Sequence, residues 1–183
     1  MDCIVIRRAE LSDRPNLLNA VAELQNYERE LHETRLPGEQ IAEAYTRWML
    51  SGAEGSGLVL LAENADEFVG FAAAWIEQVE NVAETSDSNR FGFISDICIL
   101  SKYRGKRIAN QLLEAIISHF DSAGITRVRV GVLAANRSAR LAYKRAGFQA
   151  YENDLRKNDC QVRQLPLLRA RATWNAPCWI MYR

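Results

Sequence analysis

Residues 104–109, with the sequence RGKRIA, place three basic side chains around a glycine where a helix is predicted to begin. The first backbone N–H groups of a helix have no intrahelical acceptor, and the helix dipole adds a partial positive charge there. A phosphate fits such a terminus, and Gly105 and Ala109 leave the backbone open to its approach. The pattern predicts an anion-binding cradle, with a solvated basic turn as the other interpretation.

Residues 136–148, with the sequence NRSARLAYKRAGF, predict a short helix that carries a tyrosine. Asn136 is the predicted N-cap and Gly147 the predicted C-cap. Asn136 and Tyr143 are seven residues apart, so they lie on one face of two helical turns. Spacing alone leaves two interpretations of Tyr143, a half-buried packing residue and a functional hydroxyl.

Alternating strands and helices must position these two segments. Apolar runs bounded by turn residues predict strands at residues 3–9, 58–63, 67–76, 91–100, 126–133 and 148–155. The sequence NAD between the second and third strands predicts a hairpin, and residues 77–90 predict a loop. Helical spacing of apolar residues predicts helices at residues 12–31, 38–50, 104–123 and 136–146.

The composition is that of one globular domain, because 183 residues with 48% hydrophobic side chains can bury one core. The four cysteines show no C-x-x-C spacing, which favours reduced thiols in the cytoplasm and gives no reason to expect a metal site. The sequence shows neither a secretory leader nor an apolar run long enough to cross a membrane. We therefore expect a cytoplasmic protein that binds neither membranes nor nucleic acid.

Charge is divided unevenly along a chain whose net charge is zero. Residues 1–100 hold 7 basic and 18 acidic side chains, whereas residues 101–183 hold 16 basic and 5 acidic ones. Two solvated surfaces of opposite sign are one interpretation. The functional interpretation is that the second half binds a polyanion and the first half attracts a cation.

The two segments together resemble the GNAT superfamily of acetyl-CoA-dependent N-acetyltransferases. The superfamily's second motif, N-x-x-A-x-x-x-Y-x-x-x-G-F, is complete in residues 136–148. Its first motif, R/Q-x-x-G-x-G/A, matches at Arg104 and Ala109, while Arg107 replaces the middle glycine. The resemblance covers residues 4–157 and is strong over residues 91–148.

The resemblance implies a fold and a co-substrate. The fold is α/β, with a mixed, mostly antiparallel central sheet, a splayed central pair of parallel strands, and about four flanking helices. The implied acyl donor is acetyl-CoA, whose pantetheine arm lies in the cleft between the splayed strands. The implied cofactor-binding residues are Ile97, Cys98 and Ile99 on the strand, Arg104, Gly105, Lys106, Arg107, Ile108, Ala109 and Asn110 around the pyrophosphate, and Asn136 and Arg140.

The resemblance also implies that Tyr143 is the catalytic general acid, which protonates the departing thiolate. Some members of the superfamily use a glutamate as general base, and Phe93 stands at the matching position. Ser95 and Asp96 are near, but alternation along a strand predicts that at most one of them lines the cleft. The other candidate bases are Tyr27, His32, Glu77 and Glu80, and the sequence assigns no base.

We therefore expect transfer of an acetyl group to a primary amine that is small or peptidic and cationic. The alternatives are transfer of another acyl group and a non-catalytic acyl-CoA-binding module or sensor. The GNAT-like domain is predicted to span residues 1–157. Residues 158–183 are expected to add a last strand and a tail, for which covering an edge, exchange in a homodimer, and disorder all remain open.

Overall fold

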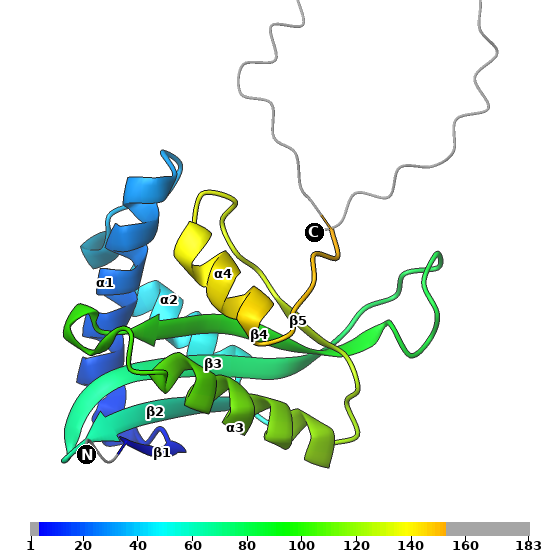
Figure 1. The fold of residues 1–183 in the computed structure, drawn as a ribbon, viewed down its shortest axis with the longest axis horizontal. Coiled ribbons are helices and arrows are strands. Elements are labelled where there is room, and N and C mark those ends of the chain that lie inside the picture. The colour runs from blue at the N-terminus through cyan, green and yellow to red at the C-terminus, as the bar shows by residue number, and fades with distance from the viewer. Residues whose placement is uncertain (1–3, 153–183) are drawn as a thin grey trace, which may run out of the picture. The chain divides into compact units, whose positions relative to one another are not determined.

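The computed structural model describes residues 4–152, where strands and helices alternate as the sequence predicts (Figure 1). The strands are β1 (Ile4–Arg8), β2 (Leu58–Asn64), β3 (Glu67–Gln78), β4 (Arg90–Ile99) and β5 (Val128–Val130). The α-helices are α1 (Arg14–Leu31), α2 (Gly38–Gly52), α3 (Ile108–Ser122) and α4 (Arg137–Arg145), with 3-10 turns at Leu11–Asp13 and Ser101–Tyr103. None of the helices in residues 4–152 is both long enough and apolar enough to cross a membrane.

Internal packing divides the chain into Met1–Gln149 and Ala150–Arg183. Almost all of the second unit lies outside the described residues. The predicted boundary between residues 157 and 158, and the last strand and tail beyond it, therefore stay predictions. The strand predicted at residues 148–155 does not form over residues 148–152, which the structure does describe.

The five strands form one sheet in the order β1-β2-β3-β4-β5. Every pair is antiparallel except β4 and β5, which run parallel. The predicted hairpin joins β2 to β3, and its turn residues Ala65 and Asp66 have φ angles of 48° and 64°. Two consecutive left-handed residues are the pattern of a two-residue type I′ hairpin turn, whose twist matches that of the strands.

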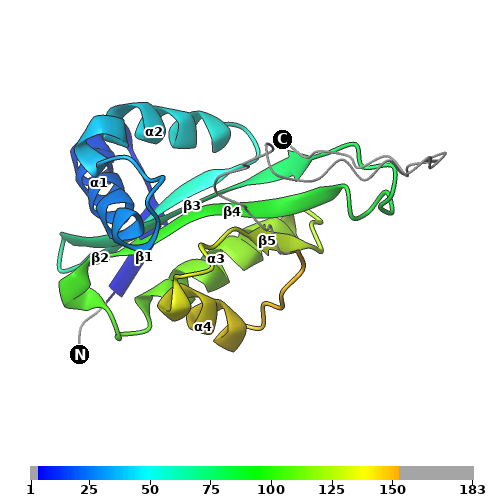
Figure 2. The ribbon, with the colours of Figure 1, turned by 90° about the horizontal axis from the view of Figure 1, so that it is seen from above.

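Two apolar layers cover opposite faces of the sheet. Figure 2 shows α1 and α2 on one face and α3 and α4 on the other. Alternating side chains serve the two layers, so Leu61 and Phe71 pack with α1 and α2 while Leu60 and Ala72 pack with α3. The packed layers fix the positions of the side chains that leave the sheet near its β4 edge.

A β-bulge interrupts the alternation within β4. Ala74 of β3 pairs with Ile94, but the next residue, Ala73, pairs with Asp96, so Ser95 is an extra residue without a partner on β3. Ile94 packs in the α3 layer, and strict alternation would place Asp96 there too. Because of the bulge, Asp96 and Cys98 lie on the α1–α2 side instead.

The parallel strands part immediately after the bulge. β4 and β5 pair from Gly92 and Val128 to Ile94 and Val130, and no further. β5 is thus shorter than the predicted strand at residues 126–133, because the bulge turns β4 away from its neighbour. The predicted splay is confirmed, and within residues 4–152 the parallel pair forms the edge of the sheet.

Candidate active site

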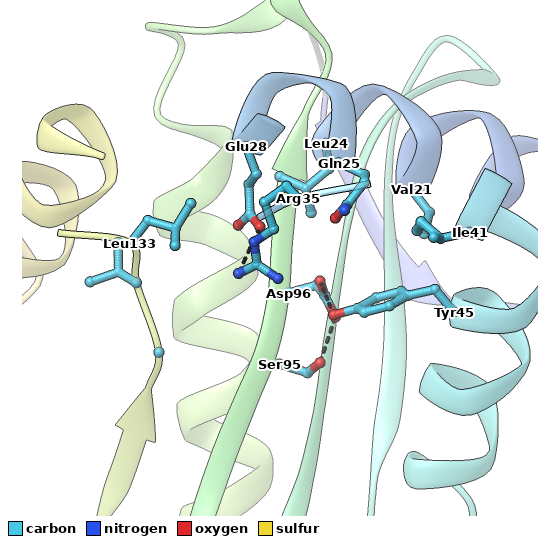
Figure 3. Close-up of a pocket in the computed structure, with 12 residues that line it drawn as sticks. Val21, Leu24, Gln25, Glu28, Arg35, Ile41, Tyr45, Ser95, Asp96 and Leu133 are labelled. Atoms are coloured by element: carbon cyan, nitrogen blue, oxygen red, sulfur yellow. Dashed lines mark hydrogen bonds and ion pairs between the residues drawn. The ribbon is translucent and has the colours of Figure 1, made fainter. Parts of the chain in front are cut away.

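A cavity of about 280 Å³ lies where β5 separates from β4 (Figure 3). Helix α1, the segment between α1 and α2, helix α2, the bulge of β4 and the residues after β5 all contribute to its wall. The lining residues are Val21, Leu24, Gln25, Glu28, Arg35, Ile41, Tyr45, Ser95, Asp96, Gly131, Val132 and Leu133. The cavity is therefore built from the acidic half of the chain on one side and from the residues after β5 on the other.

Asp96 is the buried carboxylate of this cavity, with 7% of its surface exposed. The Tyr45 hydroxyl donates to both of its oxygens, at 3.0 Å to Oδ1 and 3.2 Å to Oδ2, and Ser95 Oγ donates to Oδ2 at 2.5 Å. Burial raises the pKa of Asp96, while the hydrogen bonds from Ser95 and Tyr45 and the charge of Arg35 oppose that rise. Burial, the charge of Asp96 and the hydrogen bond to it raise the pKa of Tyr45 as well, so its hydroxyl stays protonated.

Glu28 and Arg35 form an ion pair at the same cavity, with 3.1 Å between Arg35 Nη2 and Glu28 Oε2. Figure 3 shows the Arg35 guanidinium directed toward Glu28, with Asp96 on its other side. Burial raises the pKa of Glu28, Arg35 lowers it, and the negative charge of Asp96 raises it further. The carboxylates of Glu28 and Asp96 therefore repel each other electrostatically across the cavity.

Tyr143 lies on α4 with its ring 5.8 Å from that of Phe148. Burial, followed by the charges of Asp96 and Glu28, raises the pKa of Tyr143 to about 12. The charges of Asp96 and Glu28 therefore act on the hydroxyl of the predicted catalytic tyrosine. This hydroxyl is protonated and has no hydrogen-bond partner within residues 4–152.

The basic turn before α3 holds two residues in the left-handed region, Gly105 with φ 81° and Arg107 with φ 61°. A Cβ added at Gly105 would meet nothing within 4 Å, so glycine serves the backbone angle there and fills no tight space. Arg107 is the N-cap of α3, without a side-chain cap bond. Left-handed geometry favours glycine, which explains the glycine of the first motif at the position of Arg107.

Protein partners already engage both ends of the predicted cradle. The Arg104 N–H donates to the Ser101 carbonyl at 3.3 Å, and the Asn110 N–H donates to the Arg107 carbonyl at 3.2 Å. Arg104 Nε also donates to the Ile99 carbonyl at 3.0 Å, which fastens the turn to the end of β4. The N–H groups left for an anion are those of residues 105–109, including Lys106, Ile108 and Ala109.

The predicted helix cap at Asn136 is confirmed. Its Oδ1 accepts from the Ala139 N–H and from Ser138 Oγ, both at 3.1 Å. Arg140 Nη1 donates to the Ala134 carbonyl at 3.2 Å, which joins α4 to the preceding segment. These bonds orient the helix that carries Tyr143.

On β4, Ile97 and Ile99 are partly buried against the α3 layer and Cys98 is buried against α1. The Cys98 thiol lies 3.7 Å from the Ala20 carbonyl. Burial raises the pKa of this thiol to about 12, and the nearby charge of Glu23 adds to the rise. Cys98 is therefore an unreactive core thiol, and its predicted role in binding the cofactor can involve only its backbone.

Comparison with known proteins decides the family. The model of the acetyltransferase (GNAT) family matches residues 20–148. The chain belongs to the GNAT acetyltransferase family. The uncharacterized N-acetyltransferase YycN of Bacillus subtilis (strain 168) is 35% identical over 86 residues, which are 47% of this chain and 51% of YycN. The match thus spans about half the length of that curated relative.

Solved structures share the GNAT fold at low sequence identity. A transcriptional regulator from Bacillus halodurans C-125 aligns with a TM-score of 0.66 and 18% identity, covering 86% of this chain and 100% of that one. A predicted acetyltransferase with acetyl-CoA from Clostridium acetobutylicum aligns with a TM-score of 0.62 and 16% identity, covering 85% of this chain and 96% of that one. The α/β fold expected from the resemblance is confirmed.

Among the candidate bases of this GNAT chain, the cavity brings together Ser95 and Asp96. The expectation that at most one of them lines the cleft is wrong, because the bulge places both beside the cavity. The other four candidates are absent from its wall: Tyr27 packs under the Arg104 guanidinium, His32 contacts Thr34, Glu77 accepts from Trp75, and Glu80 follows β3. No group of three or more potential metal ligands occurs in the described part of the chain.

Sequence reasoning missed three residues of the cavity, namely Glu28, Arg35 and Tyr45. A signal existed for Glu28, since it follows Val21 by seven residues and so extends an apolar stripe of α1 with a charged side chain. Tyr45 belongs to the apolar face of α2, where only the structure shows that its hydroxyl reaches Asp96. Arg35 lies between helices, and no periodicity could place it.

Proposed function

We propose that this chain transfers an acetyl group from acetyl-CoA, the acyl donor of its family, to a primary amine bound in the cavity beside β4. The observation that carries the proposal is the placement of Tyr143. Its hydroxyl lacks a protein partner within residues 4–152 and lies in the field of two cavity carboxylates, Asp96 and Glu28. A proton donor in that position suits a reaction between an amine in the cavity and the acetyl-CoA thioester in the cleft between β4 and β5.

The coenzyme's pyrophosphate would bind the N–H groups of residues 105–109 at the start of α3. Gly105 and Arg107 have left-handed φ angles, which occur in backbone turns that bind anions, and the helix dipole favours the negative charge. Lys106 and Arg107 are exposed and add positive charge beside these groups. The buried Ile108 anchors the turn, with 2% of its surface exposed.

The pantetheine arm would lie along β4 between Ile97 and Ile99, beyond the last residue pair that β4 forms with β5. A backbone N–H of this segment is a fixed donor for the thioester oxygen as negative charge develops on it. Asn136 uses its Oδ1 as the helix cap, so its amide nitrogen is the group that would meet the pantetheine. Arg140 and its exposed neighbours on α4 would meet the coenzyme's 3′-phosphate.

The chemistry is direct attack of the neutral amine on the thioester carbon, followed by loss of the thiolate. A thiol has a pKa of about 8.5, so the leaving group is a weak base, and a hydrogen bond from Tyr143 stabilises it as the C–S bond breaks. The raised pKa of Tyr143 keeps the donor form present throughout the physiological range. An ammonium in the cavity would offset the field of Asp96 and Glu28 and so ease release of the tyrosine proton.

The test is release of free CoA by the purified chain with acetyl-CoA, longer acyl-CoAs and a panel of primary amines. The proposal predicts amine-dependent CoA release and an acetylated product, with acetyl-CoA preferred. Tyr151→Phe is the matched control for Tyr143→Phe, because Tyr151 is an exposed tyrosine outside the cavity. CoA binding without release by any amine would favour a non-catalytic acyl-CoA-binding module and contradict the proposal.

A further inference from the structure

The charges around the cavity do not balance. Glu28 of α1 and Asp96 of β4 are acidic, and Arg35, between α1 and α2, is basic. Titratable groups close enough to interact with them are the hydroxyls of Tyr45 on α2 and Tyr143 on α4, and the thiol of Cys98 on β4. With the three charged groups ionised, the cavity carries one uncompensated negative charge, which is costly at a carboxylate as buried as Asp96. A single ammonium group would neutralise it.

Asp96 is the carboxylate with room for that ammonium. It accepts from two hydroxyl groups, that of Tyr45, whose single hydrogen is shared between the two carboxylate oxygens, and that of Ser95. A carboxylate offers about four acceptor positions, so it can still accept from an ammonium group. Glu28 is already paired with the Arg35 guanidinium, and 23% of its side chain is exposed against 7% of Asp96.

The bulge at Ser95 places the Asp96 carboxylate between the cavity and the cleft where β4 and β5 separate. It holds Ser95 and Asp96 on β4 immediately past the last β4–β5 pair, where the strands open and the proposed thioester site begins. Tyr45 reaches the same carboxylate from α2, on the far side of the cavity. Donors from two elements therefore hold the Asp96 carboxyl group in place at the boundary between the cavity and the cleft.

We propose that Asp96 binds the ammonium group of the acceptor and then acts as its general base, with Tyr45 and Ser95 as positioning residues. The inference rests on the proposed function and names the acceptor class, a primary amine without a carboxylate beside the amino group. The volume agrees with such an acceptor, since about 280 Å³ has room for several water-sized groups. That space suits an amine head and a short chain.

The proton transfers balance. An N–H bond of the ammonium breaks, its proton passes to an Asp96 oxygen, and the freed lone pair of nitrogen attacks the thioester carbon. When the C–S bond breaks, the sulfur takes the Tyr143 proton, and the second proton lost by the nitrogen restores the Tyr143 hydroxyl. Asp96 then releases its proton to solvent, which restores the carboxylate for the next ammonium. The cavity is neutral before the first transfer and after it, because Glu28 and Arg35 stay paired throughout.

Burial also suits Asp96 to this role, since a raised pKa makes the ionised carboxylate a stronger base than an exposed aspartate. The same charge balance selects against amino acids. An α-carboxylate would bring a third negative group to a cavity whose single guanidinium already pairs with Glu28. An amine such as phenethylamine or cadaverine should therefore react faster than phenylalanine or lysine.

The decisive variant is Asp96→Asn, which keeps the shape of the side chain and cannot accept the proton. With an alkylamine at pH 7, kcat/KM should fall about 10²-fold or more. The remaining rate should rise about tenfold per pH unit, as the amine loses its proton in solution. With a fluorinated alkylamine that is already largely neutral at pH 7, the loss should shrink to within about tenfold.

Asp121→Asn, an exposed change at the end of α3, is the matched control and should leave the rate and its pH profile unchanged. The conservative variants Tyr45→Phe and Ser95→Ala each remove one donor to Asp96 and retain the carboxylate. Their maximal rates should stay within about tenfold of the parent, with the acid limb of kcat/KM shifted to higher pH. These two variants test the inference even if Asp96→Asn does not fold.

A parent-like rate and pH profile for Asp96→Asn would overturn the inference, and so would an equal loss with both amines at every pH. Faster acetylation of phenylalanine than of phenethylamine, and of lysine than of cadaverine, would overturn the acceptor class. In each of these cases the proposed acetyl transfer stands, provided the parent chain releases CoA with some amine. Absence of CoA release with every amine would overturn the proposed function together with this inference.

Discussion

Replacing Tyr143 by phenylalanine separates catalysis from stability unusually well in this protein. The ring keeps its contact with Phe148, while the hydroxyl is lost. A positioned general acid contributes about 10²-fold to 10⁴-fold, and the weakly basic thiolate places the expected loss in kcat near 10²-fold. At about 1.4 kcal/mol per factor of ten, the transition state would lose roughly 2.7 kcal/mol.

The structure predicts no matching loss of stability. The Tyr143 hydroxyl has no partner within residues 4–152, so its removal breaks no hydrogen bond there. Burying a hydroxyl without a partner costs about 1–3 kcal/mol, and since Tyr143 is partly exposed the expected gain on its removal is below about 1 kcal/mol. The melting temperature should therefore hold or rise slightly.

Single-turnover and steady-state rates of CoA release, measured beside a thermal melt, test both halves of this prediction. The loss should appear in kcat more than in KM, because the hydrogen bond strengthens only as charge develops on sulfur. Tyr151→Phe should match the parent in its rate of CoA release. If Tyr143→Phe turns over at the parent rate, Tyr143 is a packing residue, and a fall in melting temperature with an unchanged rate would refute the reasoning entirely.

The remaining predictions concern the cradle, the buried acids and long-range charge. Ala109→Leu should weaken CoA binding in calorimetry far more than Arg107→Gly, which should also stabilise the fold by about 1 kcal/mol by relieving a left-handed arginine. Because burial raises the pKa of Asp96, this residue favours the fold only below the ordinary aspartate pKa and costs stability as pH rises through the folded pKa. Asp96→Asn should therefore melt higher at neutral pH, with the gain fading in acid. Cys98 should resist thiol alkylation at pH 8 in the folded chain, since its pKa is raised to about 12. Acetylation of cationic amines should slow with added salt, whereas neutral acceptors should show no such dependence.

The fold followed from the sequence because its signals are local. Apolar runs, helical spacing and the N-cap Asn136 are signals carried by neighbouring residues, and the structure bears them out. Gly147, predicted as the C-cap of the same helix, instead follows the C-cap Ala146 and has a φ of 92°. The left-handed turn at Arg107 was also available, through the glycine that the motif has at that position. The end of β5 was harder to predict, because a strand stops where its partner turns away and the sequence of β5 does not record that.

The cavity could be predicted only in part, because its members come from distant elements. Glu28 and Asp96 are 68 positions apart in the sequence, and nothing in either neighbourhood indicates the other. Strict alternation also placed Asp96 on the wrong face of the strand relative to Ile94. One inserted residue in β4 reverses that assignment, and an insertion of this kind is visible only in the pairing of β3 with β4.

The extra residue at Ser95 shifts the alternation of side chains between the two faces of β4 by one position. Positions before it and after it follow opposite parity, so the strand presents Ile94 to one layer and Asp96 and Cys98 to the other. If the strand kept Ser95 but alternated regularly, without the bulge, Asp96 would turn into the aliphatic layer beneath α3 and Ile97 would face the cavity. The bulge thus decides which face of β4 each later side chain takes, and so whether Asp96 lines a polar cavity or is buried in an apolar core. Sequences of this family should therefore be aligned with the bulge as their reference point.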